Sequence, residues 1–252
     1  MSRTAESPYS ALSAVYDKLG HHDYAAWSAY LVSLLKELGT PPDGRLIDAA
    51  CGTGGISILL AKAGYGVTAM DISQQMLSKA AEKASLSGAS VSFVSQDIRA
   101  MKVHRPADGI LCCCDGVNYL LGDHDLMGFL MSAHKSLKKG GALLFDISSQ
   151  AKLLNMDGQF YGEETEDSAY LWSNTVNRDR SIITMDITLF TLAEGGLFRR
   201  HNEVHNQRIW TVEEISLLLA QSGYEAKAVY GAFTHEPPAE GCDRVQFVAV
   251  AV

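Results

Sequence analysis

The sequence predicts an α/β fold, in which a parallel, doubly wound sheet carries a small antiparallel β insert. Between residues 46 and 147, short apolar runs alternate with helical stretches that have one apolar face. This alternation is typical of a parallel sheet with right-handed crossovers and helices on both faces. Residues 170–210 have the pattern of successive antiparallel strands instead, and the α/β pattern returns after residue 210.

The N-terminal residues have a helical pattern. Apolar residues recur at helical spacing from residue 9 to residue 39, and the glycine- and proline-rich segment 39–44 ends this pattern. We expect residues 1–40 to form a helical lid. The main domain is predicted to comprise residues 41–154 and 211–252, and the insert to comprise residues 155–210.

Five apolar runs in the main domain predict its first strands, and helices connect them. One helix ends at Gly64, the next is capped by Ser73, and a third is closed by Gly140 and Gly141. The predicted strands are 46–49, 67–72, 91–94, 109–114 and 142–147.

The insert is predicted to be a sheet with one covered face. Its strands are expected at 170–177, 182–192 and 198–210, because turn residues occupy 177–180 and 193–196. Ile183, Met185, Ile187 and Leu189 are apolar at alternate positions, and side chains at alternate positions of a strand share one face.

The C-terminal segment completes the main domain. Thr211 and Glu214 have the spacing of a capping box, which predicts a helix that ends at Gly223. Strands are expected at 224–233 and 244–250. Together these segments predict a seven-stranded sheet whose last strand is antiparallel.

Composition narrows the classes of function. The chain has 252 residues and a net charge of −8, which argues against binding nucleic acid through a broad basic surface. A small-molecule substrate suits this charge better. No apolar run is long enough to span a membrane, and residues 1–8 lack the apolar core of a signal peptide. We therefore expect a cytoplasmic protein, as a monomer or a homodimer.

The cysteines are not expected to bind a metal. Cys112, Cys113 and Cys114 are consecutive, so in a strand they point to alternating faces and cannot hold one ion together. We expect all five cysteines of the chain to be reduced and most of them to be buried.

The glycine-rich bend at 48–55 permits two interpretations. A dinucleotide fingerprint ends in a small residue that lets the helix pack on the strand, but here the corresponding position is Ser57. In the other frame, Asp48 precedes Ala50, Gly52 and Gly54 at the end of a strand. A carboxylate there repels a pyrophosphate and pairs with an ammonium group. A cofactor with an α-amino group and no phosphate, such as S-adenosylmethionine, fits this second frame.

Two further strand ends carry acids suited to a nucleoside. Asp71 lies 19 residues beyond Gly52, near the interval at which a second-strand acid binds ribose hydroxyls. Ser73 can cap the following helix, which leaves Asp71 available. Asp97 follows the third strand and can accept a hydrogen bond from the adenine amine, while Ile98 packs on the ring.

Three segments resemble the motifs of class I S-adenosylmethionine-dependent methyltransferases. They are Ile-Asp-Ala-Ala-Cys-Gly-Thr-Gly at 47–54, Ala-Met-Asp-Ile-Ser-Gln-Gln-Met-Leu at 69–77 and Leu-Lys-Lys-Gly-Gly at 137–141. A further resemblance is to a bacterial subgroup that acts on small molecules and has an antiparallel β insert. It rests on Tyr9, the segment 16–19 and the segment 114–120. Ala50 departs from the more usual glycine, and Lys139 departs from a common proline.

The resemblance implies a Rossmann-like domain, S-adenosylmethionine as cofactor, S-adenosylhomocysteine as product, and no metal. Residues matching Asp48, Ala50 and Gly52 contact the methionine part in that family, and the acid matching Asp71 binds the ribose. Further expected cofactor contacts are Ile72, Met76, Asp97, Ile98 and Cys114.

Aromatic residues near the N-terminus are candidates for a lid over the cofactor, because aromatic faces attract a sulfonium cation. Tyr16 is supported by the resemblance, and Tyr9 and Trp27 are expected to join it. For Trp27 and its neighbour Tyr24, a place in the core of the leading helices is an equal alternative.

The acceptor is expected near the end of the fourth strand and under the insert. Asn118 and Tyr119 follow that strand and can orient a polar substrate, although Asn118 can also cap a helix. Trp172 and Arg208 of the insert are the other expected substrate contacts, with Arg208 suited to a carboxylate.

One strand of the insert carries His201, Glu203 and His205 on a single face. A metal site, a proton acceptor and a solvent-exposed polar face are the three interpretations, and the solvent-exposed face is the first expectation. His205 is the candidate general base, if the acceptor is protonated when it binds.

The predicted function is in-line methyl transfer from S-adenosylmethionine to a nitrogen, oxygen or carbon atom of a small molecule. Two alternatives stay open at this point. A nicotinamide-dinucleotide oxidoreductase, using NAD or NADP, would share the strand–helix–strand unit, and a regulatory protein that binds the cofactor without catalysis would keep the glycine bend.

Overall fold

The computed structural model describes residues 7–19 and 23–252. Residues 1–6, on which the signal-peptide expectation largely depends, and residues 20–22 of the expected lid lie outside the described residues. None of the helices in the described ranges combines the length and the apolar character that crossing a membrane requires.

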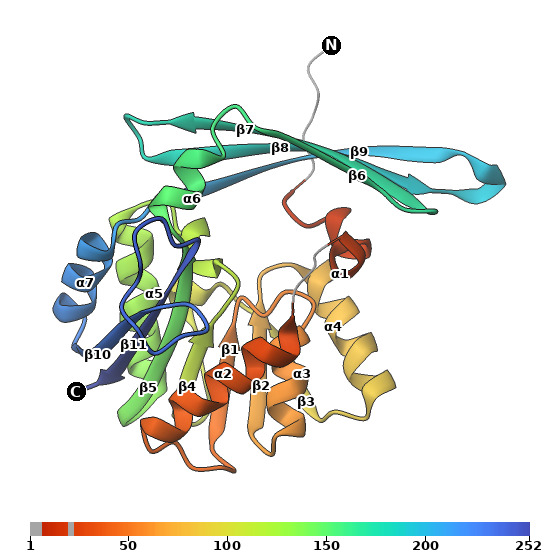
Figure 1. Ribbon diagram of the computed structural model, residues 1–252. Coiled ribbons are helices and arrows are strands. Elements are labelled where there is room, and N and C mark those ends of the chain that lie inside the picture. The colour runs from red at the N-terminus through yellow and green to blue at the C-terminus, as the bar shows by residue number, and fades with distance from the viewer. Residues whose placement is uncertain (1–6, 20–22) are drawn as a thin grey trace.

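The main sheet has seven strands in the order β10-β11-β5-β4-β1-β2-β3 (Figure 1). β1, β2, β3, β4 and β5 are parallel, and β11 is antiparallel to both β5 and β10. The predicted fold class and the antiparallel last strand are therefore confirmed. The strands are β1 Arg45–Ala49, β2 Gly66–Asp71, β3 Val91–Ser95, β4 Ala107–Cys112, β5 Leu137–Ser148, β10 Tyr224–Gly231 and β11 Arg244–Ala251.

Helices cover both faces of this sheet. α2 (Tyr24–Glu37) and α3 (Gly55–Lys62) pack in one apolar cluster, and α5 (Asp123–Ser136) and α7 (Val212–Gln221) pack in another. α4 (Gln74–Ser87) follows β2, and its N-cap is Ser73, as predicted. The capping box of Thr211 and Glu214 is also present at the start of α7.

The insert is a separate four-stranded antiparallel sheet in the order β6-β7-β8-β9. Figure 1 shows it across one end of the main sheet, with the first helical turns of the chain in between. Ile183, Met185, Ile187 and Leu189 are buried, so the covered face is confirmed. The strands are β6 Phe160–Glu164, β7 Ser168–Asn177, β8 Ile182–Leu192 and β9 Phe198–Arg208.

Some element boundaries differ from the predictions. The N-terminal helical pattern is divided into a 3₁₀ turn (Leu12–Ala14), α1 (Tyr16–Leu19) and α2, because Asp23 caps a new helix by accepting a hydrogen bond from the Ala26 backbone. β5 begins five residues earlier than predicted, at Leu137. The helix α6 (Gln150–Asn155) and the strand β6 were not predicted, because neither segment has a long apolar pattern.

Candidate functional site

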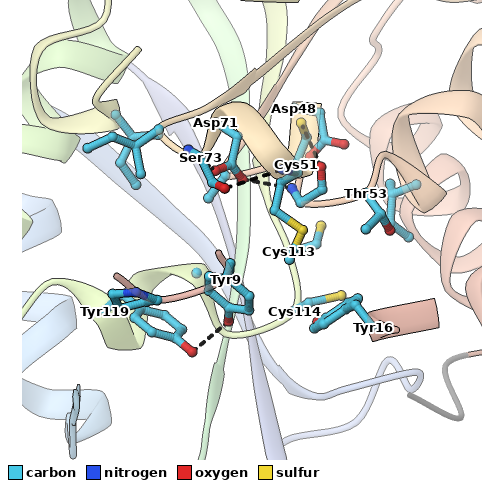
Figure 2. A pocket seen from close by; sticks show the side chains of 18 of the residues that line it. Tyr9, Tyr16, Asp48, Cys51, Thr53, Asp71, Ser73, Cys113, Cys114 and Tyr119 are labelled. Carbon is cyan, nitrogen blue, oxygen red and sulfur yellow. Dashed lines mark hydrogen bonds between the residues drawn. The ribbon is translucent and has the colours of Figure 1, made fainter. Parts of the chain in front are cut away.

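A cavity of about 540 Å³ lies where β1, β2, β3 and β4 end (Figure 2). Because parallel neighbours end at the same edge of a sheet, the acids predicted at these ends come together. All predicted cofactor contacts except Trp27 line this cavity. They are Tyr9, Tyr16, Asp48, Ala50, Gly52, Asp71, Ile72, Met76, Asp97, Ile98 and Cys114.

The glycine bend brings the backbone close to the cavity. Gly54 has φ +74°, and a Cβ there would lie 2.9 Å from the Cβ of Ala80 on α4. Only glycine satisfies both constraints. Ala50 also has a positive φ, 57°, which costs an alanine about 1 kcal/mol relative to glycine. This conformation explains why glycine is the more usual residue at that position.

Asp71 is held with its carboxylate at the cavity wall. It accepts hydrogen bonds from the backbone N–H of Gly52 and of Ser73, both at 2.8 Å. Ser73, not Asp71, caps α4 by accepting from the N–H of Met76. Burial raises the pKa of Asp71, and these backbone hydrogen bonds oppose the rise. The carboxylate keeps further lone pairs for a ligand hydroxyl.

Asp48 is a buried acid that forms no ion pair with any residue the structure describes. Its side chain is 2% exposed and accepts a hydrogen bond from the Ser57 hydroxyl. Burial raises the pKa of Asp48 to about 7; the charge of Asp71 contributes to the rise, and the Ser57 hydrogen bond opposes it. A ligand ammonium group would therefore stabilise the ionised form of this acid.

The end of the cavity beside β3 combines an acid with apolar side chains. Hydrogen bonds from Arg99 hold the pKa of Asp97 below its usual range, so Asp97 is ionised. Ile98 is buried, whereas Ile72 is 69% exposed on the cavity wall. An exposed isoleucine in a cavity is a contact surface for a flat apolar group.

A second cavity, of about 250 Å³, lies between the insert and the main domain. Tyr9, Tyr16 and Tyr119 line both cavities, so the two adjoin at these rings. Among the residues predicted for the acceptor, Tyr119, Trp172 and His205 line this second cavity.

A chain of hydrogen bonds follows the boundary between the cavities. Tyr9 Oη lies 2.5 Å from Tyr119 Oη, which lies 3.0 Å from His205 Nδ1. His205 Nε2 lies 3.0 Å from Glu203 Oε2. Burial raises the pKa of Glu203, but hydrogen bonds from His205 and from backbone N–H groups outweigh it and hold the pKa below its usual range.

The direction of these hydrogen bonds follows from the charge on Glu203. An ionised carboxylate only accepts, so His205 donates from Nε2, and in the neutral ring Nδ1 is then the acceptor for the Tyr119 hydroxyl. Tyr9 then donates to Tyr119. Burial raises the pKa of Tyr9 and of Tyr119, so both are protonated donors at neutral pH. The array thus connects the cavity boundary to His205 and Glu203.

Glu203 also anchors the N-terminal segment. Its carboxylate accepts hydrogen bonds from the backbone N–H of Tyr9, Ala11 and Leu12, at 2.7, 2.6 and 3.0 Å. Glu203 and His205 are each 1% exposed, so the expectation of a solvent-exposed polar face is wrong for this strand. Their polar groups are buried because the N-terminal segment supplies hydrogen-bonding partners.

Trp27 lies outside both cavities. It packs in the core, with its ring centroid 5.1 Å from that of Phe233 and the Arg244 guanidinium 4.9 Å from its ring centroid. Its position on the inner side of α2 agrees with the alternative expected for it, a place in the core of the leading helices.

Asn118 and Arg208 also line neither cavity. Asn118 is fully buried, and its amide accepts from the N–H of Ser148 and donates to the backbone carbonyl of Arg208. Arg208 donates to the carbonyl of Arg180 and pairs with Glu214 at 3.0 Å. These side chains join the insert to the main domain, and their polar groups are bonded to protein partners instead of facing either cavity.

One network near the site was not predicted. Asp146 on β5 accepts from the backbone N–H groups of Cys114 and Asp115, at 2.9 and 3.0 Å, and pairs with Arg244. Cys114 and Asp115 have φ values of 58° and 54°, which is a strained conformation for residues with a side chain. An isolated acid inside the apolar run of β5 was the signal in the sequence.

All five cysteines are free, as predicted. Cys112 and Cys113 are buried, but Cys51, Cys114 and Cys242 are half-buried, so the expectation that most of them are buried is wrong. Within residues 7–19 and 23–252, no group of three or more His, Cys, Asp or Glu side chains is arranged to hold a metal ion.

Comparisons with known proteins agree with this geometry. Residues 46–141 match the methyltransferase domain family. "Putative methyltransferase YqeM" of Bacillus subtilis is 34% identical, over 96% of each chain. The crystal structure of an S-adenosylmethionine-dependent methyltransferase from Clostridium acetobutylicum has a TM-score of 0.86 and 27% identity, and the match covers 96% of this chain and 98% of that one.

A relative with a named substrate is more distant. The glycine/sarcosine N-methyltransferase of Aphanothece halophytica is 26% identical over 81% of this chain and 74% of its own. The YqeM match is long and similar enough to establish family membership. This chain belongs to the S-adenosylmethionine-dependent methyltransferases and has their class I fold.

Proposed function

We propose that the protein binds S-adenosylmethionine in the larger cavity and methylates a small molecule bound in the smaller one. The observation that carries this proposal is that the two cavities adjoin at Tyr9, Tyr16 and Tyr119. The similarity to a glycine/sarcosine N-methyltransferase supports a small acceptor. Cytoplasmic location and a monomeric or dimeric state stay predictions.

The residues of the larger cavity fit this cofactor. Asp48 is a buried acid whose ionisation needs a cation, which the α-ammonium of the methionine part supplies. Asp71 suits the ribose hydroxyls, and Ile72 and Ile98 suit the faces of adenine, with Asp97 beside its amine. A pyrophosphate would lie near two acids, Asp48 and Asp71, which disfavours NAD and NADP.

The bound cofactor supplies a methyl group already activated on a sulfonium. The protein's own residues then hold the acceptor at the cavity boundary and exclude water, and positioning of this kind contributes up to about 7–11 kcal/mol. Aromatic faces of Tyr9 and Tyr16 stabilise a cation there by about 0.5–2 kcal/mol each. We propose that Tyr119 and His205 take up the proton if the acceptor binds protonated, with Glu203 positioning His205.

Two ligands separate this function from the oxidoreductase alternative. We expect S-adenosylhomocysteine to give a saturable one-site isotherm in titration calorimetry, and NADH to give none. Radiolabelled S-adenosylmethionine is then expected to transfer its label to a compound in a metabolite extract. Binding without any transfer would favour a regulatory protein, and binding of NADH alone would contradict the proposal.

Cofactor affinity is expected to rise with pH between 6 and 7. The ligand ammonium pairs with ionised Asp48, whose pKa of about 7 in the free protein leaves it largely protonated at pH 6. A simple titration then gives an increase of about fivefold from pH 6 to 7, and affinity falls again above about pH 8 as the ligand amine loses its proton. Titration calorimetry with S-adenosylhomocysteine measures this profile.

Two variants control this experiment. Asp48→Asn should remove the rise between pH 6 and 7. Ser57→Ala should move the rise to higher pH, because the Ser57 hydrogen bond lowers the pKa of Asp48. A wild-type profile that is flat over this range would show that Asp48 does not pair with the ammonium.

A further inference from the structure

Lys152 places an unmatched positive charge on the wall of the smaller cavity. It lies on α6, and its Nζ donates to the Ser148 hydroxyl at 3.3 Å. Within the described part of the chain, it forms no ion pair with a carboxylate. An ammonium group has three N–H donors, so Lys152 retains donors for a ligand.

Arg244, which also lines this cavity, is already paired with carboxylates. Arg244 pairs with Asp146 and, at 2.9 Å, with Asp115. The second oxygen of Asp115 accepts from Gln207 Nε2 at 2.6 Å. Arg244 therefore has two carboxylate partners, whereas Lys152 has none among the described residues, so Lys152 is available to pair with a ligand anion.

The remaining walls are mostly apolar. Leu153 of α6 and Met156, which follows this helix, line the cavity together with Trp172, Met185 and Ile187 of the insert. The indole N–H of Trp172 is bonded to Asn174 Oδ1 at 2.7 Å, so the rest of its ring is left for contact. At about 250 Å³, the cavity is smaller than the roughly 300–1,000 Å³ typical of drug-sized ligands. It suits a compact molecule with an apolar body.

We infer that Lys152 binds the carboxylate of the methyl acceptor, and that the acceptor is a compact carboxylic acid with an apolar body. This inference rests on the proposed function, because it takes the smaller cavity as the acceptor site. The charged end is held at α6, and the rest of the molecule extends along Trp172 and Met185 toward Tyr119. Lys152 thereby selects acids over neutral molecules of the same shape.

The test uses two probes that differ in charge but hardly in shape, 3-phenylpropionate and 3-phenylpropanamide. Each is titrated by calorimetry into protein saturated with S-adenosylhomocysteine. Because a charge-assisted hydrogen bond contributes about ten- to a hundredfold in affinity, we expect the acid to bind at least about tenfold more tightly than the amide. In Lys152→Met the acid should lose this advantage while the amide binds as before.

Two further variants control for loss of charge and for folding. Lys139→Met removes an exposed lysine of β5 and should leave both affinities unchanged. Lys152→Gln provides a polar replacement if Lys152→Met does not fold. Affinity for S-adenosylhomocysteine is measured first in every variant and should equal that of the wild type.

Three results would overturn the inference: equal binding of acid and amide to the wild type, retention of the acid preference in both Lys152 variants, or no binding of either probe. Each of these, with normal affinity for S-adenosylhomocysteine, leaves the proposed function standing. Failure of wild-type protein to bind S-adenosylhomocysteine would instead contradict the proposed function itself.

Discussion

Replacing Asp71 by alanine is expected to weaken binding of S-adenosylhomocysteine by about a hundredfold or more. The carboxylate is proposed to accept hydrogen bonds from two ribose hydroxyls, each contributing roughly 1.5–3 kcal/mol when one partner is charged. Every 1.4 kcal/mol corresponds to about a factor of ten in affinity. Asp71→Ala also removes the acceptor that fixes the N–H groups of Gly52 and Ser73. Titration calorimetry measures the loss.

A ligand analogue separates the ribose contact from damage to the glycine bend. The 2′-deoxy analogue of S-adenosylhomocysteine should bind wild-type protein more weakly than the parent ligand, whereas Asp71→Ala should discriminate little between the two. Asp71→Asn should fall between wild type and alanine, and Asp43→Ala, at an exposed acid, should bind normally. A loss within about twofold in Asp71→Ala would show that the ribose assignment is wrong.

The cofactor cavity could be predicted from the sequence because its residues follow from local patterns. Asp48, Asp71 and Asp97 each end a short apolar run, and parallel strands bring such ends to one edge. Local pattern also predicts Ser73 as the cap of α4, which leaves Asp71 for the cavity. Whether these side chains contact the cofactor stays a prediction that the Asp48 and Asp71 variants test.

The residues around the smaller cavity were harder to predict than those of the cofactor cavity, because their positions depend on contacts between distant segments. Glu203 and His205 have the polar alternation of an exposed strand, and they are buried only because the backbone around Tyr9 supplies hydrogen bonds across 194 residues of sequence. The same contact interrupts the helical pattern predicted from residue 9. The apolar pattern of a helix also does not show which side of it faces a cavity. The pattern therefore could not distinguish a lid position for Trp27 from the core position that it has.

Asn118 shows a related limit. Its position after the fourth strand suggested a substrate contact, yet its amide is used by backbone groups of β5 and β9. Polar residues near a site and polar residues that join two sheets look alike in sequence. Only the hydrogen-bonding partners distinguish them.

Replacing His205 by glutamine is expected to lower kcat by about a hundredfold or more, without changing affinity for S-adenosylhomocysteine. General-base catalysis typically contributes a factor of about 10²–10⁴. His205 Nδ1 accepts from Tyr119, whose hydroxyl lies on the boundary of the two cavities, so the array can receive the proton that a protonated acceptor loses. The measurement uses the acceptor identified by the labelled-methyl screen, at saturating cofactor.

The neighbouring residues make this prediction specific. Tyr119→Phe interrupts the route to His205 and should lower kcat to a similar extent, and the double variant should be no worse than His205→Gln alone because the two groups act in series. His201→Gln changes a histidine on the same strand that lines neither cavity, and it should retain normal kcat.

Glu203 is expected to act through His205 and not on the acceptor. Glu203→Gln replaces one oxygen by an amide that cannot accept all the hydrogen bonds now made by His205, Tyr9, Ala11 and Leu12. It should lower kcat and also speed cofactor release, since the N-terminal segment beside the cavity loses its anchor. In a His205→Gln background, only the faster release should remain. If His205→Gln has full activity, the acceptor reacts without a base, and Glu203 then serves only to hold the N-terminal segment.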